Sequence, residues 1–130
     1  RSADDGRSWT KLRGGDASLF ALHVRTDGTG FAVGQSGVVL KTTDDGLSWS
    51  ALASGTKANL LGVRSTAKGR VVVPGMRHLL ISDDDGASWR DENEGELGRA
   101  WTVAAGAAAG SESTLVVGEA ERIIRVGGVR

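Results

Sequence analysis

Short apolar runs recur along this chain, and turn sequences rich in glycine, aspartate and serine separate them. Each run is shorter than a typical helix, and most are rich in valine, leucine and isoleucine, which is typical of β-strands. The runs follow one another at roughly ten-residue intervals, a spacing that indicates an all-β domain. The predicted strands cover residues 11–13, 19–25, 31–34, 38–42, 49–52, 60–64, 71–73, 78–81, 100–104, 115–118 and 122–126.

An eight-residue segment occurs three times, at residues 2–9, 42–49 and 82–89. Each copy begins with serine or threonine, carries two or three aspartates and a glycine, and ends in Ser-Trp. The tryptophans Trp9, Trp49 and Trp89 are therefore 40 residues apart each time. A fixed period of this size indicates stacked supersecondary units rather than one irregular domain.

The repeated segment has the chemistry of a tight turn. Its carboxylate can accept hydrogen bonds from backbone N–H groups of the same turn, and its glycine adopts a φ that other residues resist. The flanking hydroxyl side chains satisfy further backbone groups locally, and the tryptophan can bury a large apolar surface beneath the turn. We therefore assign a structural role to Ser2, Asp4, Gly6, Trp9, Thr42, Asp44, Gly46, Trp49, Ser82, Asp84, Gly86 and Trp89.

These segments resemble the Asp-box, Ser/Thr-x-Asp-x-Gly-x-Thr/Ser-Trp, of sialidase-type β-propellers. Residues 31–49 are also similar to the repeat of the photosystem II stability/assembly factor family, whose pattern is aromatic-Ala-Val-Gly-x-x-Gly-x-Ile-Leu-x-Thr-x-Asp-Gly-Gly-x-x-Trp. The resemblance covers essentially the whole chain, although Pro74 replaces a usual glycine and residues 127–130 lack the expected box. It implies a non-enzymatic binding or assembly scaffold, exported in many bacteria or located in the periplasm or thylakoid lumen.

The resemblance also implies a blade layout, because in Asp-box propellers the box joins the third and fourth strands of each blade. Strands 19–25, 60–65 and 100–105 would then be innermost. The expected parts are an isolated box with an outer strand, two full blades, and a third blade that lacks its own box and outer strand. They cover residues 1–13, 14–52, 53–92 and 93–130.

Three blades are fewer than a closed propeller needs, since most rings contain about 4–8 blades. An open arc would expose apolar blade faces and unpaired strand edges, which favour association. Two explanations remain open at this point. The chain is part of a longer propeller, or two copies form a six-bladed homodimer in which the two ends complete one another.

Composition narrows the possible partners. Lysine plus arginine equal aspartate plus glutamate at 16 each, so the net charge of zero gives no bulk attraction to nucleic acid or to an anionic membrane. The sequence has no cysteine, which excludes disulfides and Cys-zinc sites, and no run approaches the roughly 20 apolar residues of a membrane-spanning helix. We expect no metal and no cofactor.

A catalytic role is less favoured than binding. Retaining sialidases use a tyrosine nucleophile, and this sequence has no tyrosine. The acidic loop with Asp91, Glu92, Glu94 and Glu96 could supply an acid, although a solvated loop is the much better explanation of it. The alternative to a scaffold is therefore a piece of a carbohydrate-binding or glycoside-hydrolysing Asp-box propeller.

Arginine outnumbers lysine by 12 to 4, and arginine is the cation most typical of protein interfaces. The blade layout places several basic residues at or near the face opposite the boxes, and one near the central channel. We expect a protein partner, or a second copy, to bind through some of them. The candidates are Arg77, His78, Arg99 and Arg122 at that face and Arg64 near the channel.

Overall fold

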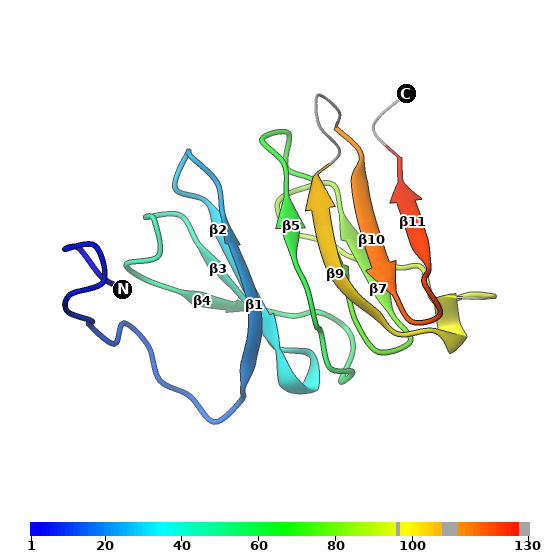
Figure 1. The fold of residues 1–130 in the computed structure, drawn as a ribbon, viewed down its shortest axis with the longest axis horizontal. Coiled ribbons are helices and arrows are strands. Elements are labelled where there is room, and N and C mark those ends of the chain that lie inside the picture. The colour runs from blue at the N-terminus through cyan, green and yellow to red at the C-terminus, as the bar shows by residue number, and fades with distance from the viewer. Residues whose placement is uncertain (96, 108–111, 128–130) are drawn as a thin grey trace.

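The computed structural model describes residues 1–95, 97–107 and 112–127. These residues form three antiparallel β-sheets that stand side by side, so the predicted all-β class is confirmed (Figure 1). Glu96 of the acidic loop, residues 108–111 and residues 128–130 lie outside the described residues. Neither of the two one-turn helices in the described part of the chain could cross a membrane.

Each sheet follows chain order from one edge to the other. The first sheet contains β1 (Leu19–Val24), β2 (Gly30–Gly34), β3 (Val39–Thr42) and β4 (Ser50–Leu52), with the short helix η1 (Gln35–Gly37) between β2 and β3. The second contains β5 (Arg64–Ser65), β6 (Val71–Pro74), β7 (Leu79–Ser82) and β8 (Arg90–Asp91). The third contains β9 (Thr102–Ala107), β10 (Thr114–Gly118) and β11 (Ile123–Val126), and the short helix η2 (Leu97–Arg99) precedes it.

The same strand register recurs in the three sheets. Phe31 lies opposite Lys41 in the first sheet, Val72 opposite Ile81 in the second, and Leu115 opposite Arg125 in the third. Because side chains alternate between the two faces of a strand, equivalent positions lie on equivalent faces. We call the side toward the following sheet the forward face, and the side toward the preceding sheet the rear face.

The first two sheets share one apolar core. The forward face of the first sheet contributes Phe31, Val33 and Val39, and the rear face of the second contributes Val63, Val71, Val73 and Leu80. Leu52 and Trp89 pack against the border of this cluster. Sheet-on-sheet burial of this kind, worth about 25 cal/mol for each Å² of apolar surface, holds the two sheets together.

A second core joins the second and third sheets. Val72, Leu79 and Ile81 on the forward face of the second sheet pack against Val116 and Val126 on the rear face of the third. Every internal face is therefore covered by its neighbour in the same manner. The pattern leaves the rear face of the first sheet and the forward face of the third without a neighbouring sheet among the described residues.

The repeated turns form the hydrogen bonds that their composition predicts. In residues 42–49, Asp44 accepts from the Ser48 N–H at 2.8 Å and from the Ser48 hydroxyl at 2.5 Å, and Gly46 N–H donates to Thr42 Oγ1 at 2.9 Å. Asp45 and Gly46 have φ values of 60° and 81°, which explains the glycine. The same side-chain bonds occur in residues 2–9 and 82–89.

The predicted inner strand 60–65 is much shorter in the structure, where only Arg64–Ser65 pairs regularly with β6. The Pro74 carbonyl accepts both the Leu61 N–H at 2.8 Å and the Gly62 N–H at 3.2 Å, so two residues oppose one. An equivalent irregularity occurs in β1 and in β9, but only the second sheet has a proline there, and Pro74 has no backbone N–H to donate to the ladder. Leu60 retains only an isolated bridge to Gly75.

The predicted strand at residues 11–13 is absent. A strand exists only where a neighbouring strand completes its hydrogen-bond ladder. Residues 1–13 instead form the first repeated turn and an extended segment that is not a strand of any of the three sheets (Figure 1).

Candidate partner-binding site

The five basic candidates divide between the two ends of the sheets. The repeated turns and the β1–β2 and β5–β6 turns lie at one end, because antiparallel neighbours place alternate connections together (Figure 1). The β2–β3, β6–β7 and β10–β11 connections lie at the other end, which holds Arg77, His78 and Arg122. Arg99 ends η2, in the connection that leads into β9 from that same end. Arg64 instead begins the short strand β5.

The backbone around Arg77 is fixed from both sides. The Met76 N–H donates to the Asn59 carbonyl at 3.0 Å, and the Arg77 N–H donates to the Ala100 carbonyl at 3.0 Å. Arg77 itself has a φ of 64°, and its side chain is exposed. A side chain presented from a fixed turn loses little backbone freedom on binding a ligand.

Arg77 lines a shallow pocket of about 330 Å³ between the second and third sheets. Trp101, 45% exposed, forms another part of its wall. Within the described part of the chain, neither the Arg77 guanidinium nor the Trp101 indole N–H has a hydrogen-bond or ion-pair partner. We call it the Arg77–Trp101 pocket; its lining is Lys57, Ala58, Asn59, Met76, Arg77 and Trp101, with no acidic residue.

Sequence reasoning missed Trp101, which it assigned simply to a strand. The available signal was that Trp101 is the one tryptophan outside the 40-residue repeat. In the structure it forms a bridge with Met76, immediately before β9 begins. Its exposed ring therefore lies next to the turn that carries Arg77.

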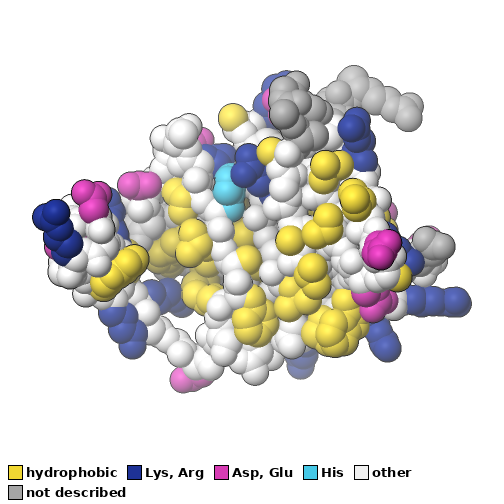
Figure 2. Space-filling model, in the orientation of Figure 1, with side chains coloured by type: hydrophobic (Ala, Val, Ile, Leu, Met, Phe, Trp, Pro, Cys, Tyr) yellow, Lys and Arg dark blue, Asp and Glu magenta, His cyan; other side chains and the backbone are white. Residues whose placement is uncertain are grey.

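The segments that carry Arg99 and Arg122 meet the same region. The Glu119 N–H donates to the Trp101 carbonyl at 3.0 Å, which ties the β10–β11 turn with Arg122 to Trp101. Arg99 is exposed, two residues before Trp101. Figure 2 shows basic side chains around the lower right of the molecule, where η2 and the β10–β11 turn lie.

His78 differs from its neighbours because its Nδ1 is hydrogen-bonded to the Asp91 carboxylate. This contact ties the start of β7 to β8 and commits the imidazole to the structure. Of the five basic candidates, Arg77 alone lines the Arg77–Trp101 pocket; Arg99 and Arg122 lie on segments near Trp101, and His78 is paired with Asp91.

Arg64 lines a separate polar pocket of about 320 Å³ near the ends of the inner strands. There His23 Nδ1 accepts a hydrogen bond from the Ser65 N–H at 3.2 Å, so the imidazole proton resides on Nε2. Burial, and then the charges of Arg64 and Arg25, lower the pKa of His23 below its ordinary 6.5. Arg64 itself has no ion-pair partner among the described residues.

The aspartates of the repeated turns have pKa values that do not suit a general acid. Hydrogen bonds, foremost from the Ser8, Ser48 and Ser88 hydroxyls, lower the pKa of Asp4, Asp44 and Asp84 to about 2. A general acid needs the opposite shift, toward neutral pH. In the acidic loop, Glu92 pairs with Arg90 at 3.2 Å. The described residues contain no group of three or more His, Asp or Glu placed to hold a metal ion.

The solved structures that resemble this chain share its arrangement of sheets. YCF48 bound to D1 peptide superposes with a TM-score of 0.70 and 18% identity, and covers 85% of this chain. YCF48 from Cyanidioschyzon merolae superposes with a TM-score of 0.71 and 23% identity, and covers 88%. The chain has the fold of a β-propeller segment. It spans 38% and 36% of those two chains, so it corresponds to somewhat more than a third of each.

Comparison of sequences adds one partial match. The uncharacterized protein YkuO of Bacillus subtilis (strain 168) is 33% identical over 60 residues, which are 46% of this chain and 20% of that protein. No protein-family model matches the sequence. The likeness to the YCF48 structures therefore establishes the fold, and the site must be argued from the residues of this chain.

Proposed function

We propose that this protein is a non-catalytic propeller scaffold, similar to the photosystem II assembly factor-like propellers, that binds an extended segment of a protein partner. The Arg77–Trp101 pocket is the observation that carries the proposal. Arginine and tryptophan are among the residues most enriched at the energetic centres of protein interfaces. The repeated turns then act as structural Asp-boxes at the opposite end of the sheets, away from the bound partner.

The pocket favours a partner segment that carries a carboxylate beside an apolar or aromatic side chain. Lys57 and Arg77 supply positive charge, and no acidic side chain lines the wall to neutralise it. A guanidinium can hold a carboxylate through two parallel hydrogen bonds, while the Trp101 ring offers apolar surface and a free N–H donor. One of the two similar YCF48 structures has a D1 peptide bound, which supports peptide binding by this fold.

The carbohydrate-active alternative lacks comparable support. The acids of the repeated turns are held ionised by their own hydrogen bonds. Asp91 and Glu92 are paired with His78 and Arg90.

The proposal can be tested with a fluorescent nine-residue capped peptide that has glutamate at alternate positions and leucine between them. We expect the wild-type protein to raise its fluorescence anisotropy, and the variants Arg77→Gln and Trp101→Ala each to weaken binding about 30-fold, as expected for interface hot spots. Arg7→Gln is the matched control, because Arg7 is exposed in the first repeated turn. Equal binding by Arg77→Gln, Trp101→Ala and the control would reject this site.

A further inference from the structure

Residues 1–13 hold a complete repeated turn that has little to pack against. Ser8 N–H donates to Asp4 at 2.9 Å and the Trp9 indole donates to the Gly6 carbonyl at 3.1 Å, as in the equivalent turn at residues 42–49. Trp9 is nevertheless 75% exposed, whereas Trp49 and Trp89 are half-buried. The turn is thus formed, but the apolar surface that its tryptophan would cover is missing.

The same segment already occupies the position of an outer strand. Within the first sheet, Lys41 of β3 lies opposite Ser50 of β4. Arg1 and Thr10 repeat this pairing, since the Thr10 N–H donates to the Arg1 carbonyl at 2.8 Å. Arg1 is the repeat equivalent of Lys41, and Thr10 of Ser50, so residues 1–13 imitate the β3–β4 connection and the start of a fourth strand.

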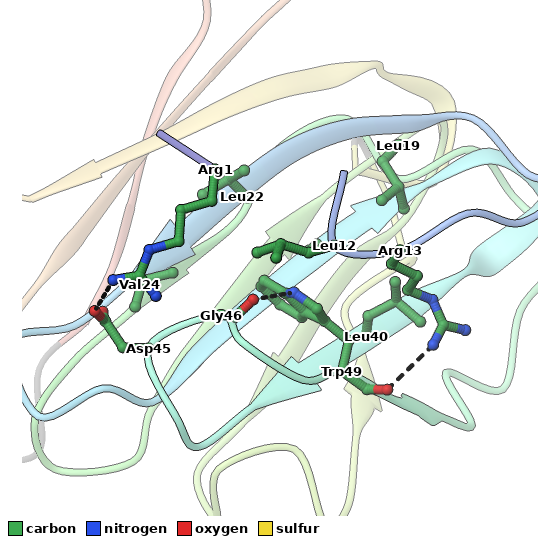
Figure 3. A pocket seen from close by; sticks show the side chains of 11 residues that line it. Arg1, Leu12, Arg13, Leu19, Leu22, Val24, Leu40, Asp45, Gly46 and Trp49 are labelled. Atoms are coloured by element: carbon green, nitrogen blue, oxygen red, sulfur yellow. Dashed lines mark hydrogen bonds and ion pairs between the residues drawn. The ribbon is translucent and has the colours of Figure 1, made fainter. Parts of the chain in front are cut away.

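Residues 1–13 also contact the first sheet in the way that β3 and β4 contact the second sheet. Lys41 donates to the Asp85 carbonyl at 2.7 Å, and Arg1 forms an ion pair with the equivalent Asp45 at 3.6 Å. A side-chain carbon at Gly86 would meet Leu52, and the equivalent Leu12 lies beside Gly46 and Trp49 (Figure 3). Residues 1–13 therefore contact the first sheet as its own outer strand contacts the second sheet.

An apolar cavity of about 440 Å³ separates this segment from the rear face of the first sheet. Figure 3 shows Leu12, Leu22 and Leu40 around it, and Leu22 is 68% exposed. The equivalents of Leu22 and Leu40 in the second sheet, Val63 and Leu80, are buried by the forward face of the sheet before. The cavity lies where three inner strands of a preceding sheet would be.

The third sheet has an uncovered face and an edge strand that complement the rear face of the first sheet and residues 1–13. Three strands of it are described, and β11 is its edge strand. Its forward face is bare: Ile123 is 69% exposed, although its equivalents Val39 and Leu79 are buried in the two cores. Figure 2 shows hydrophobic side chains gathered over this sheet, on the right of the view.

We propose that the third sheet of a second copy of this chain packs on the rear face of the first sheet, with its β11 paired to residues 10–12. In this arrangement Ile123 of the second copy lies opposite Leu12, as Val39 lies opposite Leu52 within one chain. The interface continues the packing already present twice in the molecule. The reciprocal contact produces a closed dimer with six sheets, a number within the usual range for propellers.

Solution mass tests the proposal directly. We expect light scattering across a wide dilution series to give twice the 13.4 kDa of one chain. Ile123→Asp and Leu22→Asp should each give monomers, because an aspartate would be buried without a partner in the interface. The control Leu47→Asp, also at an exposed leucine but in the second repeated turn, should remain a dimer.

Both interface positions are exposed in a single chain, so the variants should retain the wild-type circular dichroism spectrum. Mixing Ile123→Asp with Leu22→Asp adds a stricter test, because one of the two reciprocal interfaces then contains neither substitution. We expect the mixture to form dimers. A monomeric wild-type protein, open-ended larger assemblies, a dimeric Ile123→Asp variant, or a mixture that stays monomeric would overturn the proposal.

Discussion

Arg25 and Asp85, 60 residues apart, form a bidentate ion pair that connects the first sheet to the second. The guanidinium Nη1 donates to Oδ1 at 2.6 Å and Nη2 to Oδ2 at 3.4 Å, and Nη1 also donates to the Thr66 carbonyl at 2.8 Å. The Arg25 side chain is only 8% exposed. It therefore joins the end of β1 to the repeated turn of the second sheet.

Removing this cation should destabilise the fold. In Arg25→Met the Asp85 carboxylate and the Thr66 carbonyl lose their donor, and hydrogen bonds to charged groups contribute roughly 1.5–3 kcal/mol. We expect a loss of about 2 kcal/mol in the free energy of unfolding, measured by urea titration. Arg7→Met, at an exposed position, is the control and should change little. Equal stability of the two variants would show that the pair contributes nothing measurable.

Stability should fall in acid through the repeated turns. Asp44 and Asp84 have a pKa of about 2 in the folded protein against 3.8 as the ordinary value, so the unfolded chain binds more protons between these values. Their contribution is complete above roughly pH 5 and is lost as the pH falls toward 2.

The corresponding measurement is the urea midpoint at a series of acidic pH values. Asp84→Asn should lower the midpoint at neutral pH and flatten its decline in acid, because asparagine cannot accept both Ser88 donors or titrate. A variant that keeps the full wild-type pH dependence would contradict the assignment.

Close approach of the second and third sheets depends on Gly62. A side-chain carbon there would lie 2.9 Å from Pro74 Cγ and 3.0 Å from both Ala104 Cα and the Val103 carbonyl. We expect Gly62→Ala to cost about 1–3 kcal/mol, since added volume in a packed site forces the backbone to move. Gly106→Ala is the matched control on an inner strand, where the same carbon would meet nothing within 4 Å. In thermal unfolding, we expect Gly62→Ala to unfold at a lower temperature than wild type and Gly106→Ala to unfold near the wild-type temperature.

His23 offers a check on the polar pocket. Burial and the nearby Arg64 and Arg25 lower its pKa, so the neutral imidazole that accepts from Ser65 should persist below pH 6.5. In an NMR titration of the imidazole protons, Arg64→Gln should move the His23 midpoint upward by removing one positive charge. A midpoint that stays in place, or moves downward, would contradict the electrostatic account.

Local chemistry made much of the fold predictable. The three repeated turns satisfy their own backbone groups, so their sequence alone specifies their hydrogen bonds. The shortening of β5 could not be foreseen in the same way. It depends on Pro74, which has no N–H to donate, lying opposite residues that are more than ten positions earlier in the chain.

The candidate site was only partly predictable for a similar reason. The expected strand order placed Arg77, Arg99 and Arg122 at one end of the sheets, but it could not show that His78 is bonded to Asp91. It also gave no reason to select Trp101, whose position results from its bridge to Met76 in the β6–β7 connection. Long-range pairings of this kind leave no pattern in one sequence.

The binding proposal is tested most directly by the four tryptophan indole N–H signals in a proton–nitrogen correlation spectrum. Trp9, Trp49, Trp89 and Trp101 each give one signal, and they can be assigned by single Trp→Phe substitutions. On titration with the alternating glutamate–leucine peptide, we predict that the Trp101 signal shifts strongly while those of Trp49 and Trp89 stay in place. Shifts confined to the tryptophans of the repeated turns, or no shift at Trp101, would contradict binding at the Arg77–Trp101 pocket.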